Sequence, residues 1–125
     1  MNVKYLMVGD WIFDQVLQRN KRVEAFDGMG NVRLAEGHYW ESGAYVKPVQ
    51  ITDKILEENG FVKTPCGSWL WGKENNITLT EGALNWWMNI DSMIVAGEIS
   101  LPINYVHELQ HAIRLFGLKK DIVLQ

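Results

Sequence analysis

The sequence is poor in the features that stabilise secreted or membrane-spanning proteins. It contains one cysteine, Cys66, so no disulfide can form within the chain, and a lone thiol is typical of a reducing cytoplasm. Its longest apolar run is far shorter than the roughly 20 residues that a helix needs to cross a bilayer. The stretch from Met1 to Val8 is too short for a signal peptide. We therefore expect a cytoplasmic protein with no membrane partner.

Positive charge is also scarce, with 12 Lys and Arg against 15 Asp and Glu and a formal net charge of −3. A nucleic-acid coat needs many phosphate contacts, so this balance disfavours nucleic acid as the partner while leaving room for a local basic patch. Gly28-Met29-Gly30 is no phosphate loop, because no helix follows it, and no cofactor is expected. A hydrophobic fraction of 47% and a length of 125 residues predict a single globular domain, residues 1–125.

The strongest periodic signal is the segment from Ile103 to Gly117. At 100° per residue it places one apolar face opposite a polar one, which is typical of an amphipathic helix. The apolar face carries Tyr105, Val106, Leu109, Ala112, Ile113 and Phe116, and the opposite side carries His107, His111 and Arg114. The pattern predicts a helix whose apolar face packs on the core and whose histidines face solvent.

This helix contains the string His107-Glu108-Leu109-Gln110-His111, which matches the zincin pattern H-E-x-x-H. In a zincin the two histidines bind zinc and the glutamate is the general base. A catalytic zinc also needs a third protein ligand. Positions 114 and 117, where the extended pattern has glycine and histidine, are Arg114 and Gly117, and the upstream candidates His38, Asp91 and Glu98 have no supporting spacing. We expect no metal, and keep a zinc-dependent hydrolase using His107, His111 and Glu108 as the alternative.

Most of the remaining segments favour strands. Lys4 to Asp14 is strand-like with a turn or bulge at Gly9-Asp10, and Asp27 to Gly30 is a strong turn signal between two strands. Thr52 to Gly60 predicts a short helix with Thr52 as N-cap and Gly60 as the stop. Further strands are predicted at residues 45–50, 61–64, 68–71, 77–80, 84–90, 93–96 and 98–101. The pattern indicates an α+β fold: an antiparallel, partly barrel-like sheet with a short middle helix and a longer C-terminal helix packed on it.

Six tryptophans are many for a chain of this length. Trp69 and Trp71 share a face if they lie on a strand, and Trp40 falls in a polar loop. They are either bulk for a thin core or an exposed surface for a partner, and interfaces concentrate their energy in Trp, Tyr and Arg. Trp69, Trp71 and Trp40 are the binding residues we predict. A catalytic role for Cys66 lacks a neighbouring base.

Three pieces of the sequence resemble a family of small uncharacterised proteins of phages, prophages and mobile elements of Bacteroides-type gut anaerobes. They are Val8-Gly9-Asp10-Trp11-Ile12, residues 51–61 and Ile103-Asn104-Tyr105-Val106-His107-Glu108-Leu109-Gln110. In that family the positions matching Glu108 and His111 are commonly amides, which implies that these two residues are local variation. The resemblance implies an origin in a bacterial host cell and no particular reaction.

We therefore expect a small non-enzymatic interaction protein that binds a host or phage protein, for example as an inhibitor of a host defence system. The zinc-dependent hydrolase is the alternative. A nucleotide or nucleic-acid binder that uses exposed tryptophans is a third possibility. The sequence leaves the identity of the partner and the oligomeric state open.

Overall fold

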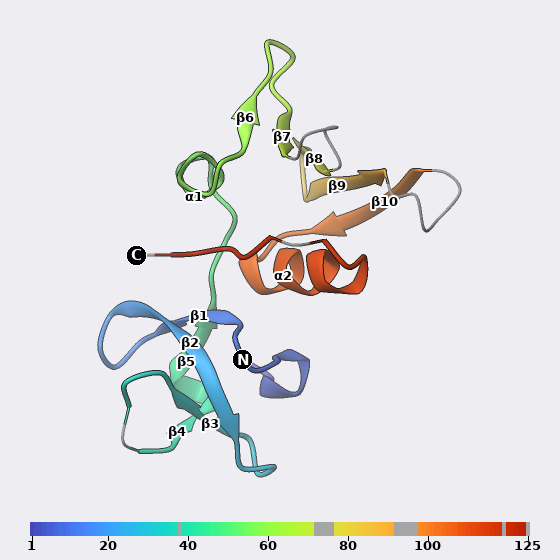
Figure 1. Ribbon diagram of the computed structural model, residues 1–125. Helices are drawn as coiled ribbons and strands as arrows, with labels where there is room; N and C mark the ends of the chain where they lie inside the picture. The colour runs from blue at the N-terminus through green and yellow to red at the C-terminus, as the bar shows by residue number, and fades with distance from the viewer. Residues whose placement is uncertain (38, 72–76, 92–97, 119, 125) are drawn as a thin grey trace.

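The fold is α+β, as the sequence predicts, with two antiparallel sheets and two α-helices among the described residues. The computed structural model describes residues 1–125 except 38, 72–76, 92–97, 119 and 125, and except the side chains of 91, 98 and 99. The first sheet has the strand order β4-β3-β2-β1-β5 and the second has the order β10-β9-β8-β7-β6. Figure 1 shows one sheet above and one below the longer helix.

The first sheet is built from residues near the N-terminus. Its elements are a 3-10 helix η1 (Val3–Tyr5), β1 (Trp11–Asp14), β2 (Arg19–Phe26), β3 (Asn31–Leu34), β4 (Glu41–Ser42), a 3-10 helix η2 (Gly43–Tyr45) and β5 (Val46–Pro48). The predicted turn between β2 and β3 is confirmed: Asp27 accepts hydrogen bonds from the backbone N–H groups of Met29 (2.7 Å) and Asn31 (3.1 Å). Gly28 and Gly30 have φ of 77° and 88°, a region that glycine adopts without strain.

The second sheet and both α-helices follow. Their elements are α1 (Asp53–Glu58), β6 (Val62–Lys63), β7 (Trp69–Trp71), β8 (Ile77–Glu81), β9 (Trp86–Asp91), β10 (Glu98–Ile103) and α2 (Val106–Leu115). The short helix is confirmed, since Thr52 Oγ1 accepts from Ile55 N (3.3 Å) and Gly60, with φ of 84°, follows its end. The strand predicted at residues 93–96 lies outside the described residues.

Neither sheet closes into a barrel over the described residues, so the partly barrel-like sheet expected from the sequence is wrong. In the first sheet β4 and β5 are the two edges, separated by the single turn of η2, and they do not pair with each other in the strand order. The opening segment also differs: residues 3–5 form η1, and the first strand begins only at Trp11, after the turn predicted at Gly9-Asp10. The N-terminal segment therefore lies outside the sheet.

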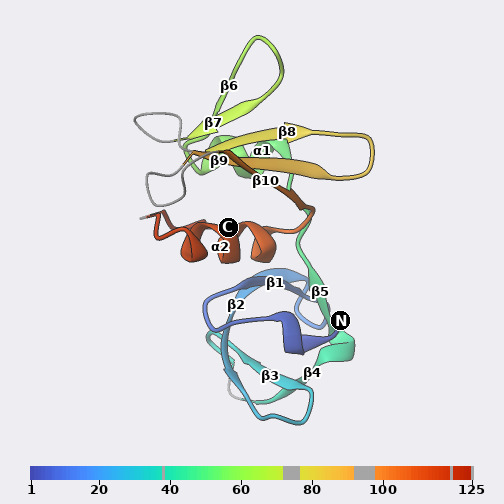
Figure 2. The same cartoon turned by 90° about the vertical axis from the view of Figure 1, so that its right-hand side faces the viewer.

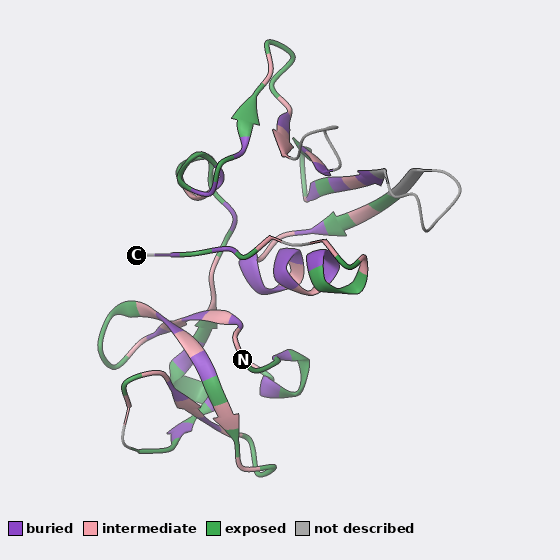
Figure 3. Ribbon diagram, viewed as in Figure 1, coloured by how far each residue is buried: buried purple, intermediate pink, exposed green. Residues whose placement is uncertain are grey.

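Helix α2 lies between the two sheets, as both views show (Figures 1 and 2). Its apolar face packs on the second sheet in one hydrophobic cluster that includes Leu109 and Ile113, which are 0% and 1% exposed. This confirms the predicted core face. The first sheet has a separate cluster of seven buried residues: Val3, Leu6, Ile12, Val23, Val32, Leu34 and Val46. Figure 3 shows buried residues on α2 and on strands of both sheets.

The polar face of α2 is turned toward the first sheet and meets the segment at the start of β1, which leaves Arg114 on this face exposed. The sequence predicted that His107 faces solvent, and this prediction is wrong: His107 is 6% exposed. An amphipathic pattern identifies the more apolar face of a helix, but it does not show whether a second layer covers the other face. Of the described helices, none is long and apolar enough to span a membrane.

Candidate functional site

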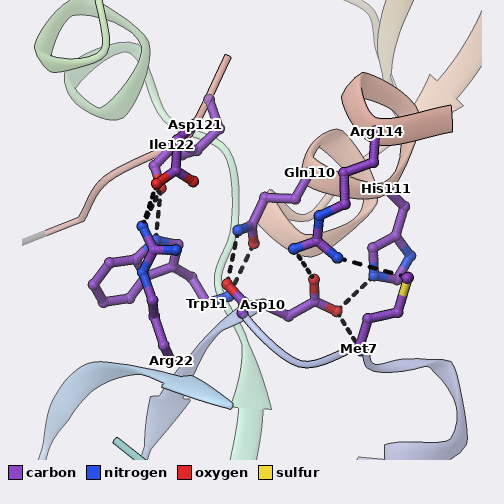
Figure 4. Close-up of polar contacts among 10 residues, drawn as sticks. Met7, Asp10, Trp11, Arg22, Gln110, His111, Arg114, Asp121 and Ile122 are labelled. Atoms are coloured by element: carbon purple, nitrogen blue, oxygen red, sulfur yellow. Dashed lines mark hydrogen bonds and ion pairs between the residues drawn. The ribbon is translucent and has the colours of Figure 1, made fainter. Parts of the chain in front are cut away.

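The polar face of α2 meets the start of β1 in a junction centred on Asp10, a fully buried carboxylate (Figure 4). One Asp10 oxygen accepts from Met7 N (2.7 Å) and lies 2.5 Å from His111 Nε2. The other accepts from an Arg114 N–H at 3.3 Å. A buried carboxylate is tolerated only when it is paired and hydrogen-bonded, and these contacts meet both conditions.

Gln110 holds the backbone on both sides of Asp10. Its Oε1 accepts from Trp11 N (2.9 Å), and its Nε2 donates to Gly9 O (3.0 Å). Gly9 has φ of 92°, and a Cβ at this position would lie 3.3 Å from the Arg114 guanidinium. Both the backbone conformation and the close approach of α2 therefore favour glycine here. The side-chain amide of one helix residue ties the start of β1 to α2.

The C-terminal segment extends the junction past the helix. Trp11 Nε1 donates to Ile122 O (2.7 Å), and the Arg22 guanidinium lies over the Trp11 ring at 4.8 Å. Arg22 also pairs with Asp121 at 2.8 Å (Figure 4). The opening Gly9-Asp10-Trp11 and the end of the chain are thus in direct contact. Two of the three pieces that carry the family resemblance, about 100 residues apart in sequence, meet at this junction.

In the string His107-Glu108-Leu109-Gln110-His111, each polar side chain has a contact that is not to a metal. Glu108 Oε1 accepts from the N–H groups of Asn104 and Tyr105, both at 3.0 Å, and so caps the start of α2. His111 pairs with Asp10. His107 stacks on Tyr105, with ring centroids 5.7 Å apart and planes at 8°. These contacts give the string a structural role at the junction.

Across the described residues, no three His, Cys, Asp or Glu side chains are grouped closely enough to hold a metal ion. Of the upstream candidates for a third ligand, His38 and the side chains of Asp91 and Glu98 lie outside the described residues. Of the described carboxylates beside the histidines, Asp10 pairs with His111 and Arg114, and Glu108 uses its Oε1 to cap α2.

Two cavities lie on either side of the N-terminal segment, and Met1 and Asn2 line both of them. The histidine cavity, of about 500 Å³, is lined by Met1, Asn2, Tyr5, Pro48, Tyr105, His107, Glu108 and His111. The apolar cavity, of about 380 Å³, is lined by Met1, Asn2, Val3, Lys4, Leu6, Phe26, Gly28, Gly30 and Asn31. Volumes of this size accommodate bulky side chains or small ligands.

His107 is the buried titratable group of the histidine cavity. Burial lowers its pKa, an effect that the carboxylates of Asp10 and Glu108 partly oppose and that His111 reinforces. Its Nδ1 has no hydrogen-bond partner among the described residues. The imidazole is therefore neutral at pH 7 and keeps one acceptor nitrogen.

The three predicted binding residues occupy different environments. Trp69 is 5% exposed and belongs to the hydrophobic cluster of the second sheet. It is therefore a core residue and not part of an exposed surface. Trp71 is half-buried against the same cluster, with Lys120 Nζ 5.4 Å from its ring. Trp40 is 45% exposed and stacks with Arg33 at 5.6 Å. The structure does not bring the three together with the histidine cavity, and a binding role for Trp40 and Trp71 stays a prediction.

A second buried polar group lies inside the first sheet, and the sequence analysis missed it. Asp14, Lys21 and Glu41 are 1%, 7% and 5% exposed. Burial, together with the hydrogen bond to Asp14 and the charge of Asp14, raises the pKa of Glu41 to about 7, while Lys21 opposes the shift. The only signal in the sequence for this group was the presence of charged residues at strand positions that face inward.

Comparison with known proteins adds no relative: no family model, no curated protein and no solved structure matches the chain.

Proposed function

We propose that the protein is a non-enzymatic binding module that recognises a partner protein through an apolar surface on its N-terminal 48 residues. Among the described residues, fifteen large apolar side chains are exposed, and ten of them lie in this part of the chain. They are Tyr5, Met7, Val8, Val16, Leu17, Phe26, Met29, Tyr39, Trp40 and Tyr45. This concentration is the observation that carries the proposal, and we call these ten side chains the N-terminal apolar surface.

The number of exposed apolar side chains is large in comparison with the small core of this part of the chain. The N-terminal 48 residues bury seven apolar residues in their own cluster, fewer than the ten that they expose. Single exposed apolar residues are ordinary, but contiguous patches of them mark surfaces that another molecule covers, and we propose that side chains of this set form such a patch. Tyr, Trp and Met, which are enriched at protein interfaces, make up six of the ten. A partner that covers this surface would give the small sheet the burial that it lacks alone.

The apolar cavity supplies an anchor point for such a partner. It lies beside Phe26, and the exposed Met29, at 84%, belongs to the same β2–β3 turn that contributes Gly28 and Gly30 to the wall. Hot spots of interfaces are bulky side chains that fill pockets of this kind. The volume of about 380 Å³ suits a large apolar or aromatic side chain of the partner.

The junction at Asp10 supports a binding role because it fixes the surface in place. Asp10, Gln110 and His111 tie the segment between η1 and β1 to α2, and Met1 N donates to Gly43 O (2.7 Å) and Val46 O (3.1 Å). A preorganised surface loses little conformational entropy on binding. The family resemblance supplies the setting that we propose: a phage or mobile-element protein that binds a host or phage protein in the bacterial cytoplasm, for example to inhibit a host defence system.

The test is capture of a stoichiometric partner from host lysate by the full chain and by two matched variants. Met29→Lys places a charge on the N-terminal apolar surface, and Leu84→Lys places the same charge on an equally exposed residue of the second sheet, where Leu84 is 89% exposed. We expect Met29→Lys to lose the partner and Leu84→Lys to retain it, with unchanged thermal melts for both. Equal capture by the two variants, or no stoichiometric partner for the unmodified chain, contradicts the proposal.

A further inference from the structure

The histidine cavity lies on the other side of the N-terminal segment from the apolar cavity, and its wall is rich in rings and in hydrogen-bond acceptors. Tyr5, Tyr105, His107 and His111 contribute rings, and Glu108 contributes a carboxylate. Tyr5 is 72% exposed at the edge of η1, whereas His107 is 6% exposed. The cavity therefore has an accessible aromatic rim and a buried polar wall.

The buried wall is suited to a ligand that donates hydrogen bonds. Glu108 uses one carboxylate oxygen, Oε1, for the two backbone N–H groups at the start of α2. An ionised carboxylate has two acceptor oxygens, so Glu108 retains acceptor capacity. His107 Nδ1 is buried and has no partner among the described residues, and in the tautomer with the proton on Nε2 it is an unused acceptor. A buried polar atom without a partner costs free energy, which a ligand that hydrogen-bonds to the ring recovers.

The carboxylate of Glu108 gives the cavity a group that can pair with a cation. Glu108 lines the wall, and Asp10 lies behind His111. Arg114 and His111 pair with Asp10, so the free negative charge at the wall is that of Glu108. The Met1 ammonium also lines the cavity, and it donates to Gly43 O and Val46 O. Burial keeps His107 uncharged, so it does not oppose a cation at neutral pH. The net charge of −3 adds a weak attraction for cations at longer range.

Among protein cations, arginine fits this wall better than lysine. A guanidinium has five N–H donors and no acceptor, and it is flat enough to stack on tyrosine rings. It is more weakly hydrated than an ammonium, so it enters a partly buried cavity more readily. It also forms paired hydrogen bonds with a carboxylate.

We propose that the histidine cavity binds an arginine side chain of the partner protein. This inference rests on the proposed function and adds a chemical requirement on the partner. The partner must present a bulky apolar residue to the apolar cavity and an arginine to the histidine cavity, on the two sides of residues 1–6. Tyr5 and Tyr105 contact the guanidinium plane, and Glu108 and His107 accept its N–H groups.

The test is an NMR titration of the full chain with N-acetyl-arginine amide, followed by the resonances of Tyr5 and His107. N-acetyl-citrulline amide, which has the same shape without the charge, and N-acetyl-lysine amide are the matched ligands. We expect saturable shifts with the arginine compound and at least a tenfold weaker response to the other two. Adenosine is included because a flat neutral heterocycle is the competing ligand class for a ring-lined cavity.

Two pairs of variants separate the site from the fold. Glu108→Gln keeps an oxygen that can cap α2 but removes the charge, and Glu57→Gln makes the same change on the exposed side of α1. Tyr5→Ala removes part of the rim, and Trp87→Ala is its control on β9, outside the cavity and the N-terminal apolar surface, where Trp87 is 43% exposed. We expect about tenfold weaker arginine binding in Glu108→Gln and Tyr5→Ala and no change in the controls.

Three outcomes overturn the inference: citrulline binds as well as arginine, adenosine binds and arginine does not, or Glu108→Gln and Glu57→Gln respond alike. None of these affects the capture experiment, which depends on Met29 on the opposite side of the N-terminal segment. If Met29→Lys loses the partner while Glu108→Gln retains it with unchanged affinity, the proposed function stands and the arginine inference fails.

Discussion

Replacing Asp10 with asparagine is the sharpest test of the junction. Asparagine keeps the shape and can still accept from Met7 N, but it loses the charge that His111 and Arg114 share. Hydrogen bonds to a charged group contribute about 1.5–3 kcal/mol each, and Asp10 itself is fully buried. The side chains of His111 and Arg114 are 28% and 39% exposed, and the arginine contact is long at 3.3 Å, which reduces the contributions. We expect Asp10→Asn to lower the free energy of unfolding by about 2–4 kcal/mol.

The measurement is urea unfolding of Asp10→Asn beside a control in which an exposed pair is broken. Glu24→Gln removes the partner of Arg33, whose side chain is 43% exposed, and should cost less than about 0.5 kcal/mol. A double-mutant cycle of Asp10→Asn with His111→Gln should give a coupling energy of about 1–2 kcal/mol. A loss below about 0.5 kcal/mol in Asp10→Asn, or no coupling to His111, would refute the role of Asp10 as the centre of the junction.

Three further predictions concern the core, the pH response and metal. Leu109→Ala should cost about 2–5 kcal/mol in urea unfolding because it leaves a cavity under α2, and a loss below about half a kcal/mol would remove this helix from the core. The pKa of Glu41 is raised from 4.5 to about 7, so its protonated form stabilises the fold below pH 4.5 and that stabilisation is lost as the pH rises through 7. Relative to the unmodified chain, Glu41→Gln should therefore gain about 1–3 kcal/mol of stability between pH 4.5 and 8, and a constant difference between the two would contradict this. Because the histidine–glutamate string has other contacts, a chelator should leave the melting temperature unchanged and elemental analysis should find less than one zinc per chain; one tightly held zinc that His107→Ala releases would restore the hydrolase alternative.

The sequence predicted the parts of the fold that depend on local signals. Thr52 and Gly60 mark the two ends of the short helix, because an N-cap and a glycine of left-handed conformation act within one turn. The turn from Asp27 to Gly30 closes the β2–β3 hairpin through contacts that are equally local. The periodicity of α2 identified Leu109 as core because one apolar stripe must be buried whatever covers the other side.

The junction could not be predicted in the same way because it joins residues about 100 positions apart. Nothing local to Asp10 shows that His111 and Arg114 lie beside it, and the helical pattern alone places these histidine and arginine side chains on a solvated face. The second layer that covers this face is a property of the topology. Trp69 illustrates the same limit: strand alternation shows that it shares a face with Trp71 but not which face is inside.

The most direct test of the binding role is site-specific photo-crosslinking in the host cell. A photoreactive amino acid is placed at Met29 on the N-terminal apolar surface and, in a second variant, at Leu84 on the second sheet; the two residues are 84% and 89% exposed. We predict one discrete crosslinked partner protein from position 29 and none from position 84. Equal crosslinking at both positions, or no discrete product at position 29, would contradict the claim that this surface recognises a partner.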